Sequence, residues 1–479
     1  MPRRTKIVAT LGPATDDDGV LDAMIAAGVD VVRLNLSHDT HARHRVRVEQ
    51  VRRRALAVDR EVGVLIDLQG PKIRIGRFSD SPITLAPGDI FTIDASCPLE
   101  AGDQERVGTT YPELGQDVAP GDTLLLDDGG VELLVQAVTG PAIRCRVVNG
   151  SKLSNNKGIN KKGGGLSASA LTEKDIEDIK TAALLKADFL AVSFPREGED
   201  MHLARRLLNE AGWDCQLVAK IERAEAIDNL DEILDASDAI MVARGDLGVE
   251  VGDAAVPALQ KRMIRMAIEK NKLAITATQM MESMITSPIP TRAEVSDVAN
   301  AVLDGTDAVM LSAETAAGKF PVEAVAAMHR VCLEAEKEAE PDFSGERLMK
   351  SFLRADEAIA MSAVFTSVHL HVKAIAALTE SGSTCLWMSR LSTRVPIYAL
   401  TPQVETRRKV TLFRGVYPIN LKTESKDREV LLAEAEEELR RRGAVREGDL
   451  ILLTIGEPIG QAGGTNTMKI VRVGAHKRN

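Results

Sequence analysis

The sequence contains few aromatic residues, no closely spaced cysteines and no long apolar run. Aromatic residues make up 3% of the 479 residues, so Val, Ile, Leu, Ala and Met must build the cores. Five isolated cysteines indicate neither a zinc site nor a disulfide scaffold, and they suit a reducing cytosol. Without a run of about 18 apolar residues, we expect no transmembrane helix. The polar start of the chain indicates no signal peptide, so we expect a cytoplasmic protein.

An excess of positive charge is also absent. The formal net charge is −10, which argues against nucleic acid as the default partner. A site for an anionic substrate would therefore need its own cluster of cations. The basic run at 41–54 favours the solvent face of a helix over a nucleic-acid-binding segment. We expect Val46, Val51 and Leu56 to be among the inward residues of that helix.

The length of the chain, 479 residues, exceeds the roughly 250–300 residues of a single core, so two or three domains are expected. Eight short apolar runs, each ending in polar residues, predict strands buried on both faces of a parallel sheet. Helix-like stretches at 16–27, 171–186 and 293–303 lie between them, and this alternation is typical of a (β/α)₈ TIM barrel. An open doubly wound sheet is the alternative, but it normally has fewer strands, and no G-x-G-x-x-G follows the first run. The runs start at Thr5, Asp30, Glu61, Ala187, Cys215, Ala239, Lys272 and Asp307.

Two regions depart from the barrel pattern. Between residues 70 and 166 the helical period is lost and Ala-Pro-Gly-Asp occurs twice, at 86–89 and 119–122, which predicts an inserted all-β domain of hairpins. After about residue 340, helix and strand patterns alternate again, which predicts an open α/β domain. The expected domains are barrel residues 1–70 and 167–340, an inserted β-barrel lid domain at 71–166 and a C-terminal α/β regulatory domain at 341–479.

Charged side chains gather where the eight runs end. In a (β/α)₈ barrel, functional residues lie at these carboxyl ends of the strands. Arg33, Arg74 and Lys220 lie there and predict a binding site for a phosphorylated anion. Glu222 and Asp246 end neighbouring strands, and two such carboxylates can bind one Mg²⁺ that bridges to substrate oxygens. Each residue alone would suit an ordinary salt bridge, so the prediction depends on their joint placement.

The longest motifs resemble those of pyruvate kinase. They are TKIVATLGPAT, VVRLNLSH, IDLQGPKIRIG, VAKIERAEA, IMVARGDLGVE and ITATQMMESMITSPIPTRAEVSDVANAVLDGTDAVMLSAET. The resemblance covers essentially the whole chain. It implies transfer of the phosphoryl group of phosphoenolpyruvate to ADP, giving pyruvate and ATP in the last step of glycolysis. It further implies Mg²⁺ as the cofactor, with Mn²⁺ as a substitute, and a homotetramer.

The resemblance also assigns roles to individual residues. Lys220 would stabilise the enolate and the phosphoryl group in flight, Arg33 would bind phosphate, and Thr278 would belong to the relay that protonates the enolate carbon. The remaining roles are Mg²⁺ ligands (Glu222, Asp246), contacts to the substrate carboxylate (Gly245, Asp246, Thr278), monovalent-cation ligands (Asn35, Ser37, Asp67, the carbonyl of Leu68) and nucleotide contacts (Pro13, Asn35, His38, Arg74, Lys157).

One position departs from the pattern of many family members. Lys72 stands where they carry Glu, and the resemblance links Glu there to a K⁺ requirement and Lys to independence from K⁺. An ammonium can supply the positive charge that a bound K⁺ otherwise brings, so we expect activity without K⁺. The same substitution weakens the case for a monovalent cation at Asn35, Ser37 and Asp67.

The loop at 379–384 lies between a predicted strand and a predicted helix of the C-terminal domain. Hydroxyl groups and a glycine at a helix N-terminus can cradle a phosphate. The loop resembles the family's effector loop, which implies allosteric activation by a phosphorylated sugar or nucleotide. A plain helix N-cap is the alternative interpretation. The implied contacts are Thr379, Ser381, Gly382, Ser383 and Thr384.

Two other functions compete with phosphoryl transfer. A barrel lyase or mutase acting on a related oxo acid would lack the lid domain and the nucleotide contacts, and the sequence predicts both. A non-enzymatic sensor that uses only the C-terminal loop would have lost its catalytic residues, whereas Lys220, Glu222, Asp246 and Thr278 are intact.

Overall fold

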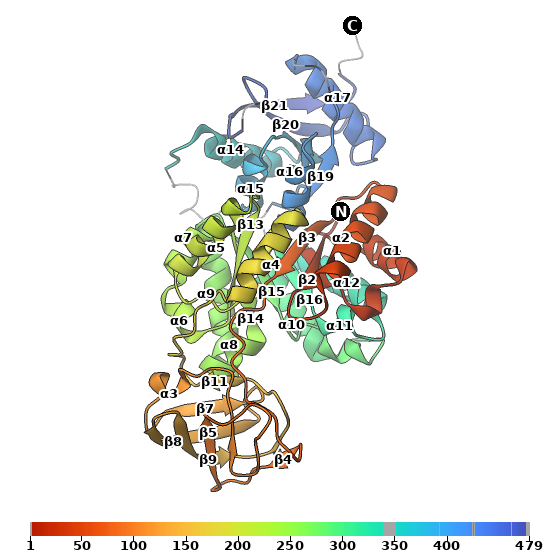
Figure 1. The fold of residues 1–479 in the computed structure, drawn as a ribbon. Coiled ribbons are helices and arrows are strands. Elements are labelled where there is room, and N and C mark those ends of the chain that lie inside the picture. Colours follow the sequence, from red (N-terminus) through yellow and green to blue (C-terminus); the bar gives the residue numbers. More distant parts are fainter. Residues whose placement is uncertain are drawn as a thin grey trace. The chain divides into compact units, whose positions relative to one another are not determined.

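A computed structural model describes residues 2–475 of the chain, apart from 339–350, 392, 424, 426 and 461 (Figure 1). The chain divides into two compact units: residues 1–67, 182–190 and 264–479 form the first, and residues 68–181 and 191–263 form the second. The expected domain boundary at 340/341 lies outside the described residues. Each of these units contains some of the barrel strands, so the division does not separate the barrel from the inserted region. The domain boundaries expected at 70/71 and 166/167 therefore stay predictions.

Eight parallel strands in the described part of the chain close into a barrel, as the apolar runs predict. Their order around the barrel is β1-β16-β15-β14-β13-β12-β3-β2. Nearly all of their residues are buried, as expected for a parallel sheet covered on both faces. The strands are β1 (Lys6–Thr10), β2 (Val31–Asn35), β3 (Gly63–Asp67), β12 (Phe189–Val192), β13 (Gln216–Ile221), β14 (Ala239–Ala243), β15 (Leu273–Ala277) and β16 (Ala308–Leu311).

Helices follow the barrel strands, and capping residues mark several of their ends. Gly28 ends α1 with a φ of 117°, which glycine adopts without strain. Thr172 and Asp175 form a reciprocal cap before α4, at 2.9 and 3.2 Å. The helices are α1 (Asp18–Ala27), α2 (His41–Ala57), α4 (Glu173–Leu184), α5 (Gly198–Glu210), α6 (Ala224–Asp228), α7 (Leu230–Ala236), α8 (Arg244–Val251), α9 (Val256–Glu269), α10 (Arg292–Leu303), α11 (Ala313–Ala316) and α12 (Pro321–Glu338), with 3₁₀ turns η1 (Pro13–Thr15), η2 (Asp253–Ala255) and η3 (Glu282–Ile285).

The inner face of α2 differs from the expectation. Val51 is buried, but Val46 is 51% exposed and Leu56 is 79% exposed, so the expectation was wrong for these two residues. The face that contains Val51 instead carries the buried Arg47, whose Nε lies 2.7 Å from Asp16 Oδ1. A charged residue can occupy an inner position when it is paired, so polarity alone did not identify this face.

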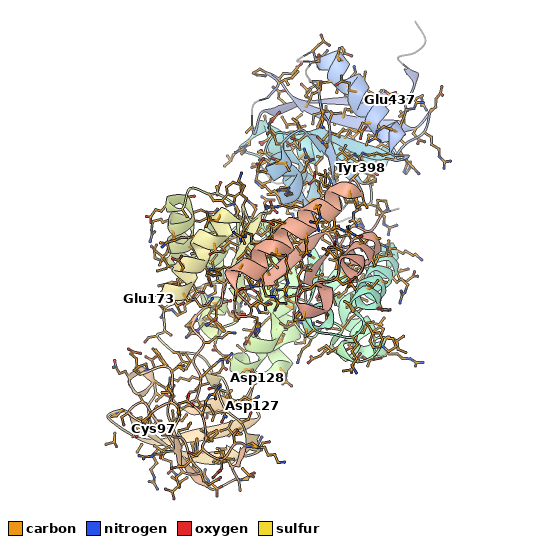
Figure 2. The ribbon with its side chains drawn as sticks, turned by 45° about the vertical axis from the view of Figure 1, so that its right-hand side comes forward. Cys97, Asp127, Asp128, Glu173, Tyr398 and Glu437 are labelled. Atoms are coloured by element: carbon orange, nitrogen blue, oxygen red, sulfur yellow. The ribbon has the colours of Figure 1, made fainter. Side chains whose placement is uncertain are left out.

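The segment between β3 and α4 folds into β-structure, as predicted, and belongs to the second unit. Both Ala-Pro-Gly-Asp segments form the same turn, with a positive φ at Gly88 (98°) and Gly121 (100°). Asp127 and Asp128 form the turn between β7 and β8 (Figure 2). A six-stranded sheet has the order β11-β7-β8-β9-β5-β6, and β10 pairs with β4. The elements are β4 (Ile83–Thr84), β5 (Ile90–Asp94), β6 (Arg106–Val107), α3 (Leu114–Asp117), β7 (Thr123–Leu126), β8 (Val131–Thr139), β9 (Ala142–Asn149), β10 (Lys152–Leu153) and β11 (Ile159–Lys161).

The C-terminal residues form the predicted α/β domain around a sheet of order β19-β18-β17-β20-β21, in which β21 alone is antiparallel among the described strands (Figure 1). Leucines of α17 pack against this sheet in one apolar cluster. No helix in the described ranges is long and apolar enough to cross a membrane. The elements are α14 (Ala355–His369), β17 (Ala374–Leu378), α15 (Ser383–Ser389), β18 (Ile397–Thr401), α16 (Val404–Lys409), η4 (Val410–Leu412), β19 (Val416–Asn420), α17 (Arg428–Arg441), β20 (Leu450–Gly456) and β21 (Thr465–Arg472).

Buried charges join the C-terminal domain to the starts of the barrel strands within the first unit. Asp307, next to β16, accepts a hydrogen bond from Arg390 Nη1 at 2.8 Å, and both side chains are almost fully buried. Glu61, just before β3, accepts one from Arg407 Nε at 2.6 Å. Each pair compensates charges that would otherwise be costly to bury, so these contacts depend on both partners.

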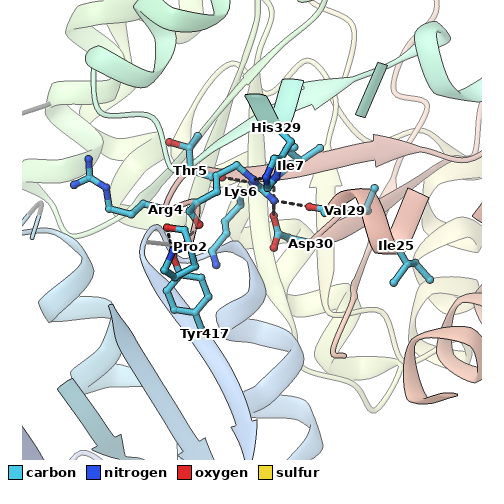
Figure 3. A network of polar contacts seen from close by, with 12 residues as sticks. Pro2, Arg4, Thr5, Lys6, Ile7, Ile25, Val29, Asp30, His329 and Tyr417 are labelled. Carbon is cyan, nitrogen blue, oxygen red and sulfur yellow. Dashed lines mark hydrogen bonds and ion pairs between the residues drawn. The ribbon is translucent and has the colours of Figure 1, made fainter. Parts of the chain in front are cut away.

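Figure 3 shows a further part of this contact, around the N-terminal residues. Lys6 Nζ donates a hydrogen bond to the carbonyl of Val416 at 2.5 Å and lies 4.5 Å from the centre of the Tyr417 ring. Burial lowers the pKa of Lys6 to about 8. Arg3 pairs with Asp30 at 2.8 Å and accepts a hydrogen bond from Tyr417 Oη on its carbonyl, also at 2.8 Å. The first residues of the chain are thereby fixed to the C-terminal domain.

Asp188, immediately before β12, is a buried carboxyl in the same unit. Its Oδ2 accepts a hydrogen bond from Val64 N at 2.8 Å, and the residue is 8% exposed. Burial raises its pKa to about 7, although Arg408 and Arg52 act in the opposite direction. Because the pKa is higher in the folded state, this carboxyl favours folding when protonated and loses that contribution as the pH rises through about 7.

Replacing Asp188 with Asn should therefore stabilise the protein more at pH 8.5 than at pH 5.5, because pH 5.5 lies only part of the way between the ordinary carboxyl pKa and the raised value of about 7. The amide oxygen can still accept from Val64 N, and the cost of burying a carboxylate is removed. We expect a rise in melting temperature of about 2–4 °C at the higher pH. Thermal melts at the two pH values measure it, with the exposed Asp214→Asn as control. A rise of equal size at both pH values would contradict the assignment.

Candidate active site

The carboxyl ends of the barrel strands in the first unit hold a buried ion pair. Arg33 Nε, in β2, donates to Asp67 Oδ2, at the end of β3, at 2.6 Å. Arg33 Nη1 also donates to Thr10 Oγ1 at 3.0 Å, and the Thr10 hydroxyl donates to the carbonyl of Leu311 at 2.9 Å. Two fixed partners orient a planar guanidinium with five N–H donors, an arrangement that suits the binding of a phosphate.

The end of β2 and the loop after it carry three more of the predicted residues. Asn35 is paired in register with Asp67, and its side-chain oxygen accepts a hydrogen bond from Ser37 N at 3.0 Å. Ser37 is half-buried, whereas His38 is exposed. The carbonyl of His38 lies 2.8 Å from His44 Nε2, which holds the loop to α2. Pro13, predicted as a nucleotide contact, is exposed in η1.

Thr278 follows β15 in a backbone conformation that is rare for its type. Its φ is 65° and that of Gln279 is 54°, and a β-branched residue in this region is strained. Thr278 Oγ1 donates to the carbonyl of Ala277 at 2.7 Å. The neighbouring loops are held by Glu314, which accepts hydrogen bonds from Met281 N and Ser312 N. Burial raises the pKa of Glu314.

The second unit holds the predicted catalytic lysine. Lys220 Nζ, in β13, lies 2.9 Å from Glu222 Oε1 and donates to Ser193 Oγ at 2.7 Å. Glu222 is 2% exposed, and its Oε2 accepts a hydrogen bond from Phe194 N at 2.9 Å. The carbonyl of Leu68, a predicted monovalent-cation ligand, accepts from Ser193 Oγ at 2.7 Å. An ammonium and a carboxylate are thus buried side by side, each with a second polar partner.

Gly245 and Asp246 lie in the first turn of α8, directly after β14, and both are half-buried. The N–H groups of a first helical turn and the positive end of the helix dipole favour a bound anion. In the described ranges, no three His, Cys, Asp or Glu side chains form a group that could hold a metal ion. Two carboxylates nevertheless suit Mg²⁺, which usually keeps water and substrate oxygens as its other ligands. Glu222 and Asp246 therefore fit a Mg²⁺ that binds together with its substrate.

The predicted nucleotide contacts Arg74 and Lys157 lie close together in the inserted region. Arg74 forms a β-bridge with Gly158, the neighbour of Lys157. Lys157 Nζ pairs with Asp127 Oδ1 at 2.7 Å. Lys72 is half-buried, and its carbonyl accepts from Thr110 Oγ1 at 3.3 Å.

The predicted effector loop borders a cavity of about 350 Å³ in the C-terminal domain. Thr379, Ser381 and Thr384 line it, whereas Gly382 and Ser383 are not among its lining residues. Gly382 has a φ of 82° and precedes α15, and its N–H donates to Thr379 Oγ1 at 2.9 Å. The described residues of the lining include Glu380 but no Lys or Arg. Any phosphate bound there would be held by hydroxyl and backbone N–H groups.

Two residues that belong to these clusters were not identified by the sequence analysis. Ser193 ends the fourth apolar run and Thr10 ends the first, and both contact predicted site residues. The sequence contained a signal for each: both are polar residues at the end of an apolar run, which is the criterion that identified the candidate site residues of the other six runs. The positive φ of Phe194, 56°, had no such signal, since an aromatic residue seldom adopts it.

Comparison with known proteins supports the same interpretation. The family profile described as "Pyruvate kinase, barrel domain" matches residues 2–325, and "Pyruvate kinase, alpha/beta domain" matches residues 357–471. Pyruvate kinase II of Salmonella typhimurium is 54% identical over 475 residues, which cover 98% of this chain and 99% of that protein. Pyruvate kinase of Haemophilus influenzae is 53% identical, covering 95% and 96%. Pyruvate kinase of Mycobacterium intracellulare is 44% identical, covering 99% of both chains.

The closed barrel, the inserted β-structure, the C-terminal α/β domain and these relatives define the class of the protein: it is a phosphotransferase built on a (β/α)₈ barrel. Within that class, the chain belongs to the pyruvate kinase family.

Proposed function

We propose that this chain transfers the phosphoryl group of phosphoenolpyruvate to ADP, giving pyruvate and ATP in the last step of glycolysis. The observation that carries the proposal is the buried Lys220 ammonium, held 2.9 Å from Glu222 and 2.7 Å from Ser193. Family membership gives the substrates, because the relatives are named pyruvate kinase.

Negative charge develops on the enol oxygen as the phosphoryl group leaves. An ammonium already in place stabilises that charge without reorganisation, which is the role we assign to Lys220. Arg33, oriented by Asp67 and Thr10, would bind the phosphoryl group. When bound by Glu222 and Asp246, Mg²⁺ would supply positive charge to the substrate oxygens.

The remaining roles concern the rest of the substrate. The N–H groups of Gly245 and Asp246 would bind the substrate carboxylate, together with the hydroxyl of Thr278. The same hydroxyl would take part in protonating the enolate carbon. A fixed, strained turn at Thr278 suits such a role, because strained conformations concentrate at active sites. We also predict that the inserted domain acts as a lid that excludes water from the site.

Lys220→Met should lower kcat by at least about 10²–10³-fold, because it removes the charge that stabilises the transition state. A coupled assay of pyruvate release from phosphoenolpyruvate, ADP and Mg²⁺ measures this loss. Lys180→Met, at an exposed lysine of α4, serves as the matched control. Near-wild-type turnover in a folded Lys220→Met variant would overturn the proposal.

We also propose that turnover does not require K⁺. Lys72 brings a positive charge where many relatives in the family carry Glu. Two of the oxygens implied as ligands of a monovalent cation already accept hydrogen bonds: Asp67 from Arg33 and the Leu68 carbonyl from Ser193. Both partners compete with a cation for those oxygens.

The wild-type enzyme should therefore turn over at a similar rate in K⁺-free buffer and at high K⁺. The variant Lys72→Glu should lose activity without K⁺ and regain it at high K⁺, because the ion then replaces the missing charge. Lys162→Glu, at an exposed lysine of the inserted region, controls for the change in net charge. Large K⁺ activation of the wild-type enzyme would refute K⁺ independence.

A phosphorylated sugar or nucleotide is the activator we propose for the C-terminal cavity. Ser381 and Thr384 are among its lining residues, and their hydroxyls lie 2.8 Å from Ser383 Oγ and 2.6 Å from Thr465 Oγ1, respectively. The homotetramer is proposed as well, on the family resemblance alone.

Ser381→Ala should abolish the response to the effector, expressed as the ratio of rates with and without it. The measurement is a titration with sugar monophosphates, sugar bisphosphates and AMP at subsaturating phosphoenolpyruvate. Ser362→Ala, at an exposed serine of α14, is the control. Full activation of the Ser381 variant would place the effector elsewhere.

A further inference from the structure

The end of β12 brings a buried hydroxyl to the catalytic lysine. Ser193 follows Val192 directly and is 1% exposed. Its Oγ accepts a hydrogen bond from Lys220 Nζ at 2.7 Å and donates one to the carbonyl of Leu68 at 2.7 Å. All three residues belong to the second unit.

The direction of these hydrogen bonds follows from the groups involved. A lysine ammonium can only donate, and a backbone carbonyl can only accept. The single proton of the Ser193 hydroxyl therefore goes to the Leu68 oxygen, and a lone pair faces Lys220. Glu222 Oε1 lies 2.9 Å from the same ammonium, so Nζ is held from two sides.

The backbone around Ser193 is shaped to make these contacts. Phe194 has a φ of 56°, a sparsely populated conformation for an aromatic residue, and its N–H donates to Glu222 Oε2 at 2.9 Å. Gly70 packs against this bend so closely that a Cβ there would lie 2.8 Å from Ser193 Cβ. One tight bend thus provides a partner for Lys220 and a partner for Glu222.

We propose that Ser193 is a positioning residue for phosphoryl transfer, which acts by holding Lys220 Nζ where charge develops in the transition state. The inference rests on the proposed function, because it takes Lys220 as the stabilising group. A lysine side chain has a flexible four-carbon stem, so an ammonium with one partner fewer samples more positions. Small displacements of a catalytic group cost rate more than they cost substrate binding.

Ser193→Ala should lower kcat about 10–100-fold and change the KM for phosphoenolpyruvate by less than about 3-fold. Ser193→Thr, which keeps the hydroxyl, should recover most of the rate. Ser367→Ala, at a buried serine of α14 whose hydroxyl donates to Val364 O, controls for loss of a buried hydroxyl. Melting temperatures establish that each variant is folded. Wild-type kcat in folded Ser193→Ala would overturn the proposal.

A double-mutant cycle separates positioning from a general structural effect. If Ser193 acts through Lys220, Ser193→Ala should change the residual rate of Lys220→Met by less than about 2-fold. The same loss in both backgrounds would mean that Ser193 acts on its own, which refutes the inference. If Lys220→Met itself retains full activity, the proposed function fails instead, so the two failures are distinguishable.

Discussion

The burial of an ammonium beside a carboxylate, Lys220 against Glu222, is the constraint on which the candidate site depends. Removing both charges from water is costly, and their attraction compensates only if each also has further hydrogen-bond partners. The tight bend at 193–194 supplies one to each: Ser193 Oγ for Lys220 and Phe194 N for Glu222. The bend has a positive φ at Phe194, and Gly70 packs against it so closely that a Cβ there would lie 2.8 Å from Ser193 Cβ.

Buried charges also occur at the opposite ends of the barrel strands, where they serve a different purpose. Asp307 and Glu61 pair with Arg390 and Arg407 of the C-terminal domain. These partners come from a separate domain in regular helices and their ends, and they join two folded parts. At the carboxyl ends, by contrast, Glu222 has its partner Phe194 N on a bend with a positive φ of 56°, whereas Arg33 and Asp67 lie in regular strands. Burial of charge alone therefore does not identify a catalytic site, whereas burial combined with local strain is a stronger indication.

Much of the fold could be predicted because its signals are local. The eight strands follow from continuous apolar runs, and the end of α1 at Gly28 follows from the left-handed conformation that glycine accepts. The inner face of α2 could not be predicted in the same way, since Arg47 is buried there with two carboxylates from outside the helix, Asp16 and Asp39, as its partners. The positive backbone φ angles at Phe194 and Thr278 cannot be predicted from the residue types at these positions. They are imposed by tertiary contacts, which a single sequence does not encode in any local pattern.

Ser193 also links two features that the sequence analysis treated separately: the placement of Lys220, which we propose as the catalytic lysine, and the need for a monovalent cation. Its hydroxyl proton goes to the carbonyl of Leu68, an oxygen that the family resemblance assigns to that cation. A cation bound there would draw on the same oxygen and weaken the acceptor for the Ser193 proton. The hydroxyl could then rotate, and its hold on Lys220 would change with it. On physical grounds, an enzyme that positions its lysine through this hydroxyl gains by keeping the Leu68 carbonyl free of a cation, which is consistent with a fixed ammonium at Lys72 in place of a bound ion.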